Sequence, residues 1–448
     1  MFRTFTTPSG VIDLEEQRVK KTLAVLTITV LAASALWIAT APPSYYEPAG
    51  LRVLGAPPEA LLRADVGDVI KTQLVTIAPE IPGNDENLVL PGTGNVLVSG
   101  RDEWIWQVNV ESQTAEKIAY APVSPTGTRP VPGKPDQVYF CMARLDFHTY
   151  ENPPGVYRLD LKTRTFTPVV TQVPLTGHMR EDGLEQPNFT QVDEERVYPE
   201  PLMNTPVARL DANNSRTLQF CNDLDVTPDG RYIYITEPFS HPKASSGLGA
   251  FGDGITLARN GRIWRYDTHT RSIGLVVENI VFADGILIEY DEQAQPTSLL
   301  ISETVNFRIG RAYLQGERAG GYEVLWDDLP GLPDGIDRDD QGRIWIGLIK
   351  DRTPLITWMH RNPWVKPLIL RIPPQWLPAS RGTAILGLSP DASEIIAYSH
   401  HDGSRILDIS VVAPAGDRLY LPSFHKDNAG LHYLPIDALL GTREDTAP

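Results

Sequence analysis

Between residues 80 and 438 the sequence repeats one short pattern: a strand of alternating apolar residues, a polar turn and another strand. The stretches "LDVTPDGRYIYITEP" and "DGIDRDDQGRIWIGLI" both show it. The pattern returns roughly every 40–60 residues with about four short strands per unit, which is typical of a β-propeller. A β-sandwich needs only about 100 residues, and a single closed barrel does not explain the repetition. We therefore predict an all-β, six-bladed β-propeller over residues 81–438.

An uncharged run, "TLAVLTITVLAASALWIATA", precedes the repeats at residues 22–41. A helix of about 20 residues spans roughly 30 Å, the hydrocarbon core of a bilayer. The basic residues just before the run are Arg18, Lys20 and Lys21. Positive residues beside a membrane helix favour the cytoplasmic side. This pattern predicts one N-terminal transmembrane helix, with the propeller outside the cytoplasm.

A cleavable signal peptide is the alternative interpretation of this run, and "ATA" resembles a cleavage site. The run is long for a signal peptide, and Pro42 would directly follow the cut. An uncleaved anchor is therefore favoured. The remaining boundaries follow: residues 1–21 form a cytoplasmic tail, 42–80 a proline-rich stalk or lead-in, and 439–448 a C-terminal tail.

The charge and cysteine content narrow the possible partners. A formal net charge of −16 argues against nucleic-acid binding, which needs clustered Lys and Arg. The two cysteines, Cys141 and Cys221, match no zinc-binding spacing. They form either one disulfide, if the domain lies outside the cytoplasm, or two buried free thiols, and both possibilities stay open. No feature of the sequence predicts a particular oligomeric state.

Oxygen-bearing side chains stand at the beginning of the first strand in four repeats. They occur in "NDENLVL", "FCNDLDV", "VFADGILI" and "GLPDGIDR", as Glu86, Asn222, Asp284 and Asp334. The first strands of propeller blades line the central channel, so these side chains should converge near its axis. Calcium prefers six to eight such hard oxygen ligands, whereas zinc prefers Cys and His. The alternative is that each residue only caps a turn.

Several stretches resemble the strictosidine synthase-like family, which includes the adipocyte plasma membrane-associated proteins. They are "NDLDVTPDGRYIYITEP", "GRIWRYDTHT", "FADGILI", the long match around "GLPDGIDRDDQGRIWIGL", and "GDRLYLPSFHKDNAGLHYL". The pattern is more distantly similar to gluconolactonases, paraoxonases and diisopropyl-fluorophosphatase, which are calcium-dependent hydrolases with the same propeller.

The resemblance implies a calcium ion near the channel axis, held by a Glu, two Asn and an Asp. Glu86, Asn222 and Asp334 match three of these ligands, and Asp284 replaces the second Asn. A true strictosidine synthase uses a catalytic Glu shortly before a strand of the last blade. The corresponding stretch here, "ILDISVVAPAG", contains no Glu, so alkaloid synthesis is not expected.

These features favour a calcium-dependent hydrolase of lactones or aryl esters. Asp334 would activate water or attack directly. The sequence has no Gly-x-Ser-x-Gly elbow, which argues against an ordinary serine esterase. Of the histidines near blade loops, His241, His400, His401 and His425, we name His425 as the candidate base because it ends a strand of the last blade. The competing hypothesis is a non-catalytic, membrane-tethered binding module with a structural calcium.

Overall fold

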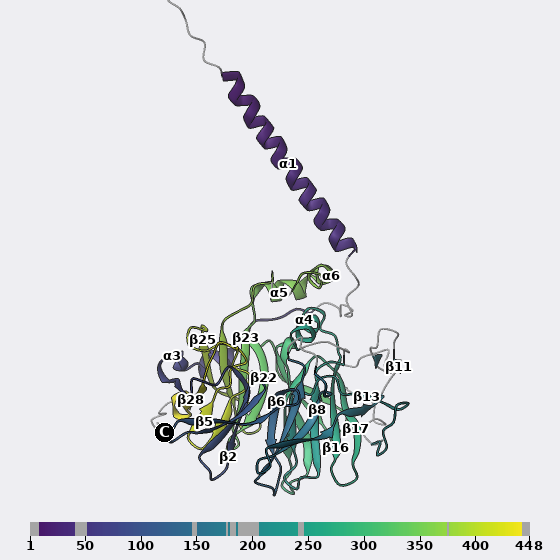
Figure 1. Cartoon of the computed structure of the whole chain (residues 1–448), viewed down its shortest axis with the longest axis vertical. Helices are drawn as coiled ribbons and strands as arrows, with labels where there is room; N and C mark the ends of the chain where they lie inside the picture. The colour runs from purple at the N-terminus through teal and green to yellow at the C-terminus, as the bar shows by residue number, and fades with distance from the viewer. Residues whose placement is uncertain are drawn as a thin grey trace, which may run out of the picture.

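The body of the protein is a six-bladed β-propeller, which confirms the predicted fold class (Figure 1). The computed structural model describes residues 9–40, 52–145, 150–175, 178–179, 185–186, 206–240, 246–373 and 376–440. Each blade is a four-stranded antiparallel sheet, and in five of them the strands follow one another along the chain.

The strands are given blade by blade in sheet order, with the strand nearest the axis first. Blade one holds β2 (Asn84–Leu90), β3 (Asn95–Gly100), β4 (Trp104–Asn109) and β5 (Thr114–Tyr120), and blade two holds β6 (Ser124–Pro130), β7 (Gln137–Ala143), β8 (Gly155–Asp160) and β9 (Thr165–Val170). Blade three holds β14 (Leu224–Val226), β15 (Tyr232–Glu237), β16 (Gly261–Asp267) and β17 (Ser272–Ile280), and blade four holds β18 (Ala283–Tyr290), β19 (Pro296–Glu303), β20 (Arg308–Tyr313) and β21 (Tyr322–Trp326). Blade five holds β22 (Gly331–Arg338), β23 (Ile344–Asp351), β24 (Thr383–Leu388) and β25 (Ile395–His401), and blade six holds β26 (Ala413–Ala415), β27 (Arg418–Tyr420), β28 (Leu431–Pro435) and β1 (Val75–Ile77).

The ring is closed by pairing the two ends of the propeller sequence. Strand β1 is the outermost strand of blade six and pairs antiparallel with β28, Val75 opposite Tyr433. Two short helices before it, α2 (Glu59–Ala64) and α3 (Val69–Gln73), pack on β25 of blade five. The segment expected to be a stalk, 42–80, therefore contributes to the propeller body from α2 onward.

Apolar residues fill the space between neighbouring blades. Trp264 and Trp345 both follow Gly-Arg-Ile and are fully buried, one between blades two and three and the other between blades five and six. Each indole Nε1 donates a hydrogen bond to a carboxylate, Glu237 at 3.0 Å and Asp339 at 2.9 Å. Because the polar atom of each ring is satisfied, the large apolar surface can be buried at little cost.

Two insertions cover one end of the channel (Figure 1). Helix α4 (Ser246–Thr256) lies between β15 and β16. The second insertion, between β23 and β24, holds α5 (Pro354–Arg361), the 3-10 helix η3 (Pro363–Val365) and α6 (Lys366–Ile369), and we call this segment the cap. The remaining elements are the pairs β10 (Gln172–Pro174) with β13 (Ser215–Thr217) and β11 (His178–Met179) with β12 (Glu185–Gln186), η2 (Thr304–Asn306) and α7 (Asp437–Leu440).

A long N-terminal helix, α1 (Ser9–Thr40), extends away from the propeller (Figure 1). Its segment Gln17–Trp37 is long and apolar enough to cross a membrane, and none of it is buried against the rest of the chain. This agrees with the predicted single transmembrane helix near residues 22–41.

Candidate active site

The inner strands present pairs of consecutive residues to a cavity at the capped end of the channel. In blade one, Asp85 and Glu86 fall where the register between β2 and β3 shifts. Asp284 in blade four and Asp334 in blade five fall at the same kind of shift. Such a β-bulge leaves the extra residue unpaired and turns its side chain away from the normal alternation. The lining residues from the six inner strands and the segments beside them are Asp85, Glu86, Gly127, Asn222, Asp223, Asp284, Asp334, Gly335, Ser410 and Val411.

Gly285 explains how two of these bulges come so close together. A Cβ atom at this position would lie 2.8 Å from the backbone nitrogen of Ile336 and would also press on the carbonyl oxygen of Asp334. Glycine therefore allows β18 to approach β22. The hydroxyl of Ser302 links the two strands, since it accepts from the Gly285 N–H at 2.9 Å and donates to the Asp334 carbonyl.

The cavity has a volume of about 630 Å³, with carboxylates at its base and apolar walls. The base is formed by the inner strands, while α4 and the cap cover the opposite side. This volume lies in the range of sites for small organic molecules. The principal apolar residues of the walls are Phe251, Ile255, Phe282, Val305, Phe307, Ile356, Met359 and Phe424.

Five carboxyl groups share the base of this cavity, of which Glu86, Asp223 and Asp284 are buried and Asp85 and Asp334 are half-buried. Burial is the main cause that raises the pKa of Asp85 to about 7, of Asp223 to about 6 and of Asp284 to about 7. Burial also raises the pKa of Glu86 and Asp334 well above the usual range. Taking several like charges out of water is unfavourable unless a cation or bound protons offset them.

Asp284 and Asp334 interact directly within this group. A hydrogen bond between their carboxyl groups favours the charged form of Asp284 and the protonated form of Asp334, and after burial the charge of Asp284 is the largest cause that raises the pKa of Asp334. The hydroxyl of Thr304 donates to Asp284 Oδ2 at 2.7 Å. The two protons of such a pair leave in coupled steps, as in other carboxylate dyads.

Cations lie both below and beside the carboxylates. Arg129, which is half-buried, places its guanidinium 3.9 Å from Asp223 and 3.7 Å from Asp225. Arg101 lines the cavity and stacks over the ring of Phe424 at 4.0 Å. If all five carboxyl groups were ionised, these two cations would offset only part of their charge.

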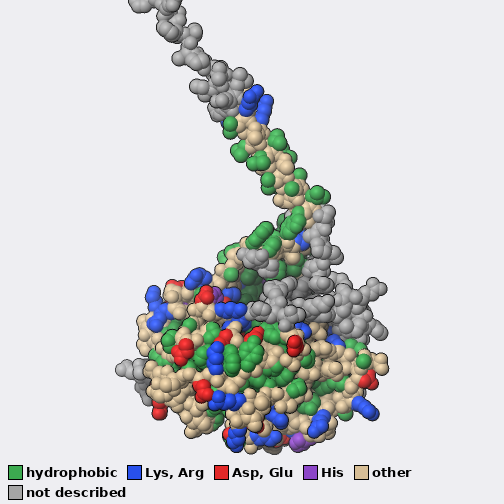
Figure 2. All heavy atoms as spheres, in the orientation of Figure 1, with side chains coloured by type: hydrophobic (Ala, Val, Ile, Leu, Met, Phe, Trp, Pro, Cys, Tyr) green, Lys and Arg blue, Asp and Glu red, His purple; other side chains and the backbone are tan. Residues whose placement is uncertain are grey.

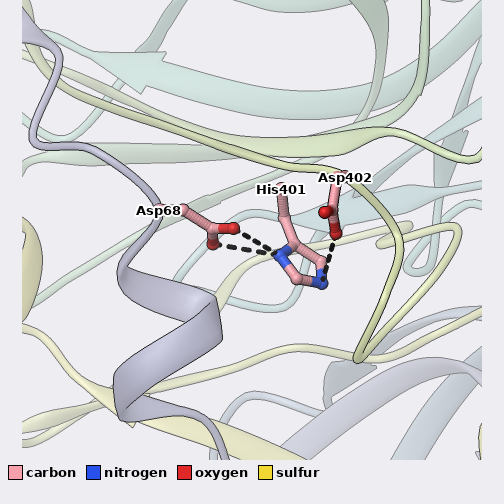
Figure 3. A group of neighbouring side chains, drawn as sticks. All are labelled: Asp68, His401 and Asp402. Carbon is pink, nitrogen blue, oxygen red and sulfur yellow. Dashed lines mark hydrogen bonds and ion pairs between the residues drawn. The ribbon is translucent and has the colours of Figure 1, made fainter.

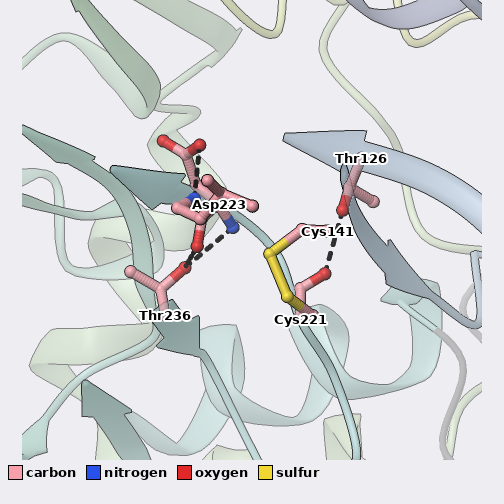
Figure 4. Close-up of a disulfide and its surroundings, with 6 residues drawn as sticks. Thr126, Cys141, Cys221, Asp223 and Thr236 are labelled. Carbon is pink, nitrogen blue, oxygen red and sulfur yellow. Dashed lines mark hydrogen bonds between the residues drawn. A yellow bond between two sulfur atoms is a disulfide. The ribbon is translucent and has the colours of Figure 1, made fainter. Parts of the chain in front are cut away.

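A disulfide fixes the segment before β14 that carries Asn222 (Figure 4). Cys141, on β7 of blade two, is bonded to Cys221 of blade three. The hydroxyl of Thr126 donates to the Cys221 carbonyl at 2.9 Å. Asp223 is held by Thr236, whose Oγ1 accepts the Asp223 N–H at 2.9 Å. Asn222 therefore lies between two anchored residues, and of the two states left open for the cysteines the structure shows the disulfide.

The structure brings the four predicted metal ligands to one cavity, but it does not bring the histidines there. Glu86, Asn222, Asp284 and Asp334 all line the cavity, whereas His425 does not. The Nδ1 atom of His425 instead accepts the backbone N–H of Asp427 at 3.3 Å. Two other candidates also lie outside the lining: His400 pairs with Asp351 at 3.1 Å, and His401 belongs to the cluster described next. Position 241 lies outside the described residues.

The tightest cluster of potential metal ligands in the described part of the chain lies elsewhere, at Asp68, His401 and Asp402 (Figure 3). Its ligand atoms lie within 4.8 Å of one another, which is closer than any three Asp, Glu, His or Cys side chains of the cavity. However, His401 Nε2 accepts the backbone N–H of Arg405 at 3.0 Å, while Nδ1 faces Asp68 at 2.9 Å. Asp68 also caps α3. Both ring nitrogens are thus engaged, and Nδ1 holds the N-cap residue of α3 on blade five.

Two residues of the site, Asp85 and Asp223, were not predicted. Each directly adjoins a predicted residue, Glu86 or Asn222. In a regular strand adjacent side chains point to opposite faces, so a pattern of alternation assigns only one of each pair to the channel. The paired polar residues in "NDEN" and "CNDLD" were the available signal.

The sequence comparisons with known proteins point to the same group of proteins. A family model described as strictosidine synthase matches residues 218–317. Adipocyte plasma membrane-associated protein of Salmo salar is 35% identical over 161 residues, covering 35% of this chain and 37% of the relative. The Homo sapiens protein of the same name is 29% identical over 218 residues, covering 47% and 50%. Protein STRICTOSIDINE SYNTHASE-LIKE 13 of Arabidopsis thaliana is 30% identical over 177 residues, covering 40% and 41%.

The matched region spans about half, or less, of the length of these curated relatives. Among solved structures, a putative gluconolactonase is 14% identical with a TM-score of 0.45, covering 86% of this chain and 97% of that one. A gluconolactonase of Xanthomonas campestris is 14% identical with a TM-score of 0.47, covering 88% and 99%.

Proposed function

We propose that this chain, which belongs to the strictosidine synthase-like family, is a calcium-dependent hydrolase of lactones or aryl esters. The observation that carries the proposal is the group of buried and half-buried carboxyl groups at the base of a cavity whose walls are apolar. A purely structural channel gains nothing from an accessible cavity above its acidic residues.

The chemistry of the donor set fits a hard divalent cation. Glu86, Asn222, Asp284 and Asp334 would hold it, and all four offer oxygen atoms, the ligands that calcium prefers. The buried negative charge at the base exceeds that of the nearby arginines, so a dication would offset it. No Cys or His lines this cavity within the described residues, which argues against zinc.

When bound, calcium would polarise the substrate carbonyl and stabilise negative charge developing on its oxygen. Asp334 is the group of this chain that handles the proton. Once Asp334 has lost its own proton, it is ionised and can accept a proton from the attacking water. Burial and the charge of Asp284 raise the pKa of Asp334, which makes its carboxylate a stronger base than an ordinary aspartate.

The walls of the cavity define the kind of substrate. Apolar side chains such as Phe251, Phe282 and Met359 would pack against a hydrocarbon or aromatic body. The carboxylate base would then face the ester or lactone group, so we propose a neutral, lipophilic ester or lactone rather than an anionic one.

The proposal is tested by hydrolysis of phenyl acetate and a γ-lactone panel by the full-length protein, with calcium and after chelation. We expect turnover that needs calcium and that falls by about two orders of magnitude or more in Asp334→Asn, as on loss of a general base. The matched control is Asp340→Asn, which removes an exposed carboxylate from the turn after β22 and should leave turnover unchanged.

Two outcomes would contradict the proposal. Calcium that raises thermal stability without turnover of any ester or lactone would favour the non-catalytic binding module. Turnover that Asp334→Asn leaves intact would remove Asp334 from the mechanism.

A further inference from the structure

The outer surface of the cap carries unusually exposed tryptophans. Trp364 is 68% exposed and Trp376, just beyond α6, is 72% exposed. Trp358 is 46% exposed and meets Trp364 edge to face at 6.5 Å between ring centroids. Leu368, on α6, is 38% exposed beside them. Large aromatic side chains are seldom left in water in such a group, so this surface has a partner.

The cap is amphipathic, which explains why this surface is not part of the core. Ile356 and Met359 of α5 line the cavity, and Met359 also packs against Ile255 of α4. The inner side of the cap therefore closes the cavity. Trp358 and Trp364 point to the other side and contribute to no apolar cluster among the described residues.

The sequence around the cap, residues 352–390, is basic, whereas the chain as a whole is acidic. No Asp or Glu occurs between Arg352 and Pro390, although the chain has a net charge of −16. The same segment has five basic residues, of which Arg361 and Arg381 are exposed, Arg352 and Arg371 are half-buried and Lys366 is buried. An exposed aromatic surface within a basic segment matches the interface of an anionic bilayer, where tryptophan and arginine are both favourable.

The chain also enters the propeller at the cap. Arg52 is the first described residue after α1, and its N–H donates to the His360 carbonyl at 3.3 Å. Arg361 Nη2 donates to the Leu54 carbonyl at 2.9 Å, and Leu54 is fully buried. Residues 41–51 separate Thr40 from this contact, which limits its distance from the end of α1 to about 40 Å. Figure 2 shows hydrophobic side chains gathered where the cap faces α1.

We propose that the outer surface of the cap docks on the bilayer that α1 crosses, with Trp358, Trp364 and Trp376 in the headgroup region. The partner is a lipid surface with anionic lipids. The inference does not depend on the proposed hydrolase activity, since it rests on exposure, charge and the point where the chain joins the cap. It places the capped end of the channel against the membrane.

The test places one spin label on the full-length protein in nanodiscs of phosphatidylcholine and phosphatidylglycerol. The two native cysteines are bonded to each other, so one introduced cysteine gives one labelling site. Leu368→Cys keeps all three tryptophans, and Trp364→Cys is a second position on the same surface. Gln293→Cys, exposed in the β18–β19 turn at the opposite end of the blade, is the control.

We expect labels at 368 and 364 to collide more with oxygen, which concentrates in lipid, than with a water-soluble nickel chelate. The label at 293 should show the reverse. Replacing all three tryptophans by glutamine should return the label at 368 to water. A label at 368 that is open to the nickel chelate in the parent overturns the proposal. A label shielded from both reagents also overturns it, because a protein partner or second copy would then cover the cap.

Discussion

At the scale of single residues, Asp284 is the position where this chain departs from the ligand set that its resemblance to the strictosidine synthase-like proteins implies. With Asp284 ionised, the three carboxylates and Asn222 carry three negative charges, so Asp284→Asn should weaken calcium binding. Burial raises the pKa of Asp284 to about 7, so at lower pH a proton must leave this carboxyl group before a cation binds. Affinity in the parent should therefore rise with pH up to about 7, and this rise should flatten in the variant.

Titration calorimetry of both proteins at about pH 6 and about pH 8 measures this effect directly. Asp340→Asn again serves as the control, since it removes an exposed carboxylate distant from the cavity. Equal affinities and equal pH slopes in parent and Asp284→Asn would show that Asp284 does not touch the metal.

The sequence predicted the residues that meet at the axis better than it predicted their neighbours. Glu86, Asn222, Asp284 and Asp334 could be found because each begins a repeat. Asp85 did not follow from the pattern because a β-bulge reverses the facing of one residue, and Asp223 did not because it lies just before β14, outside the regular alternation of the strand. The role of His425 followed only from its place at a strand end, and the structure does not bring it into the cavity.

At the scale of elements, the approach of β18 to β22 depends on Gly285. Gly285→Ala should destabilise the protein by roughly 1–3 kcal/mol, because the added methyl group meets backbone atoms of Asp334 and Ile336 that cannot move aside. Gly254→Ala in α4 is the matched control. Its Cβ would meet Val305 at 3.6 Å, an ordinary contact, and alanine favours a helix by about 1 kcal/mol over glycine.

Urea unfolding of both variants measures the difference. Gly285→Ala should unfold at lower urea than the parent, and Gly254→Ala at equal or higher urea. A Gly285→Ala variant as stable as the parent would mean that the two inner strands can separate without cost.

The cap should be sensitive to acid through His360. This side chain is fully buried, and its two ring nitrogens have no hydrogen-bond partner among the described residues. Burial, followed by the charges of Lys366 and Arg52, lowers its pKa from 6.5 to about 3. The folded state therefore keeps it neutral while the unfolded chain takes up a proton below about pH 6.5, so stability falls as pH drops toward 3.

At pH 4.5 this contribution amounts to roughly 2–3 kcal/mol. His360→Leu should reduce the loss of stability between pH 7 and pH 4.5, as read from urea midpoints. His269→Leu, an exposed histidine in the β16–β17 turn, should not reduce it. If both variants lose as much stability as the parent, His360 is not the acid-sensitive group.

The cap itself was not predicted from the sequence. Its first helix does have a sequence signal at its N-terminus. The N-cap residue Thr353 accepts the Ile356 N–H through Oγ1 at 3.2 Å, and Pro354 occupies the first helical position. However, α5 has only eight residues, too few for a helical period to stand out within a chain of repeating strands. A short insertion between two strands of one blade folds according to what it packs against, and its own sequence does not contain that information.

At the scale of the whole molecule, the repeat predicted the blade number but not the way in which the ring closes. Strand β1 is three residues long, and the first two of them, Val75 and Thr76, are exposed. Such a strand has no pattern of its own and becomes ordered only by pairing with β28. A segment that resembles a stalk in sequence therefore contributes to ring closure.

The orientation of the molecule is the last prediction. The basic residues before the apolar run favour a cytoplasmic N-terminus, and the Cys141–Cys221 disulfide suits an oxidising compartment on the other side. Two single-cysteine variants test this, Ser9→Cys before the apolar run and Gln293→Cys on the propeller. In intact cells, with any outer membrane permeabilised, a membrane-impermeant maleimide should label position 293 but not position 9. After lysis both should react, while the parent should react only after reduction, because its two cysteines are bonded to each other. Labelling of position 9 but not 293 in intact cells would reverse the orientation, and labelling of the parent without reduction would show that the disulfide does not form in the cell.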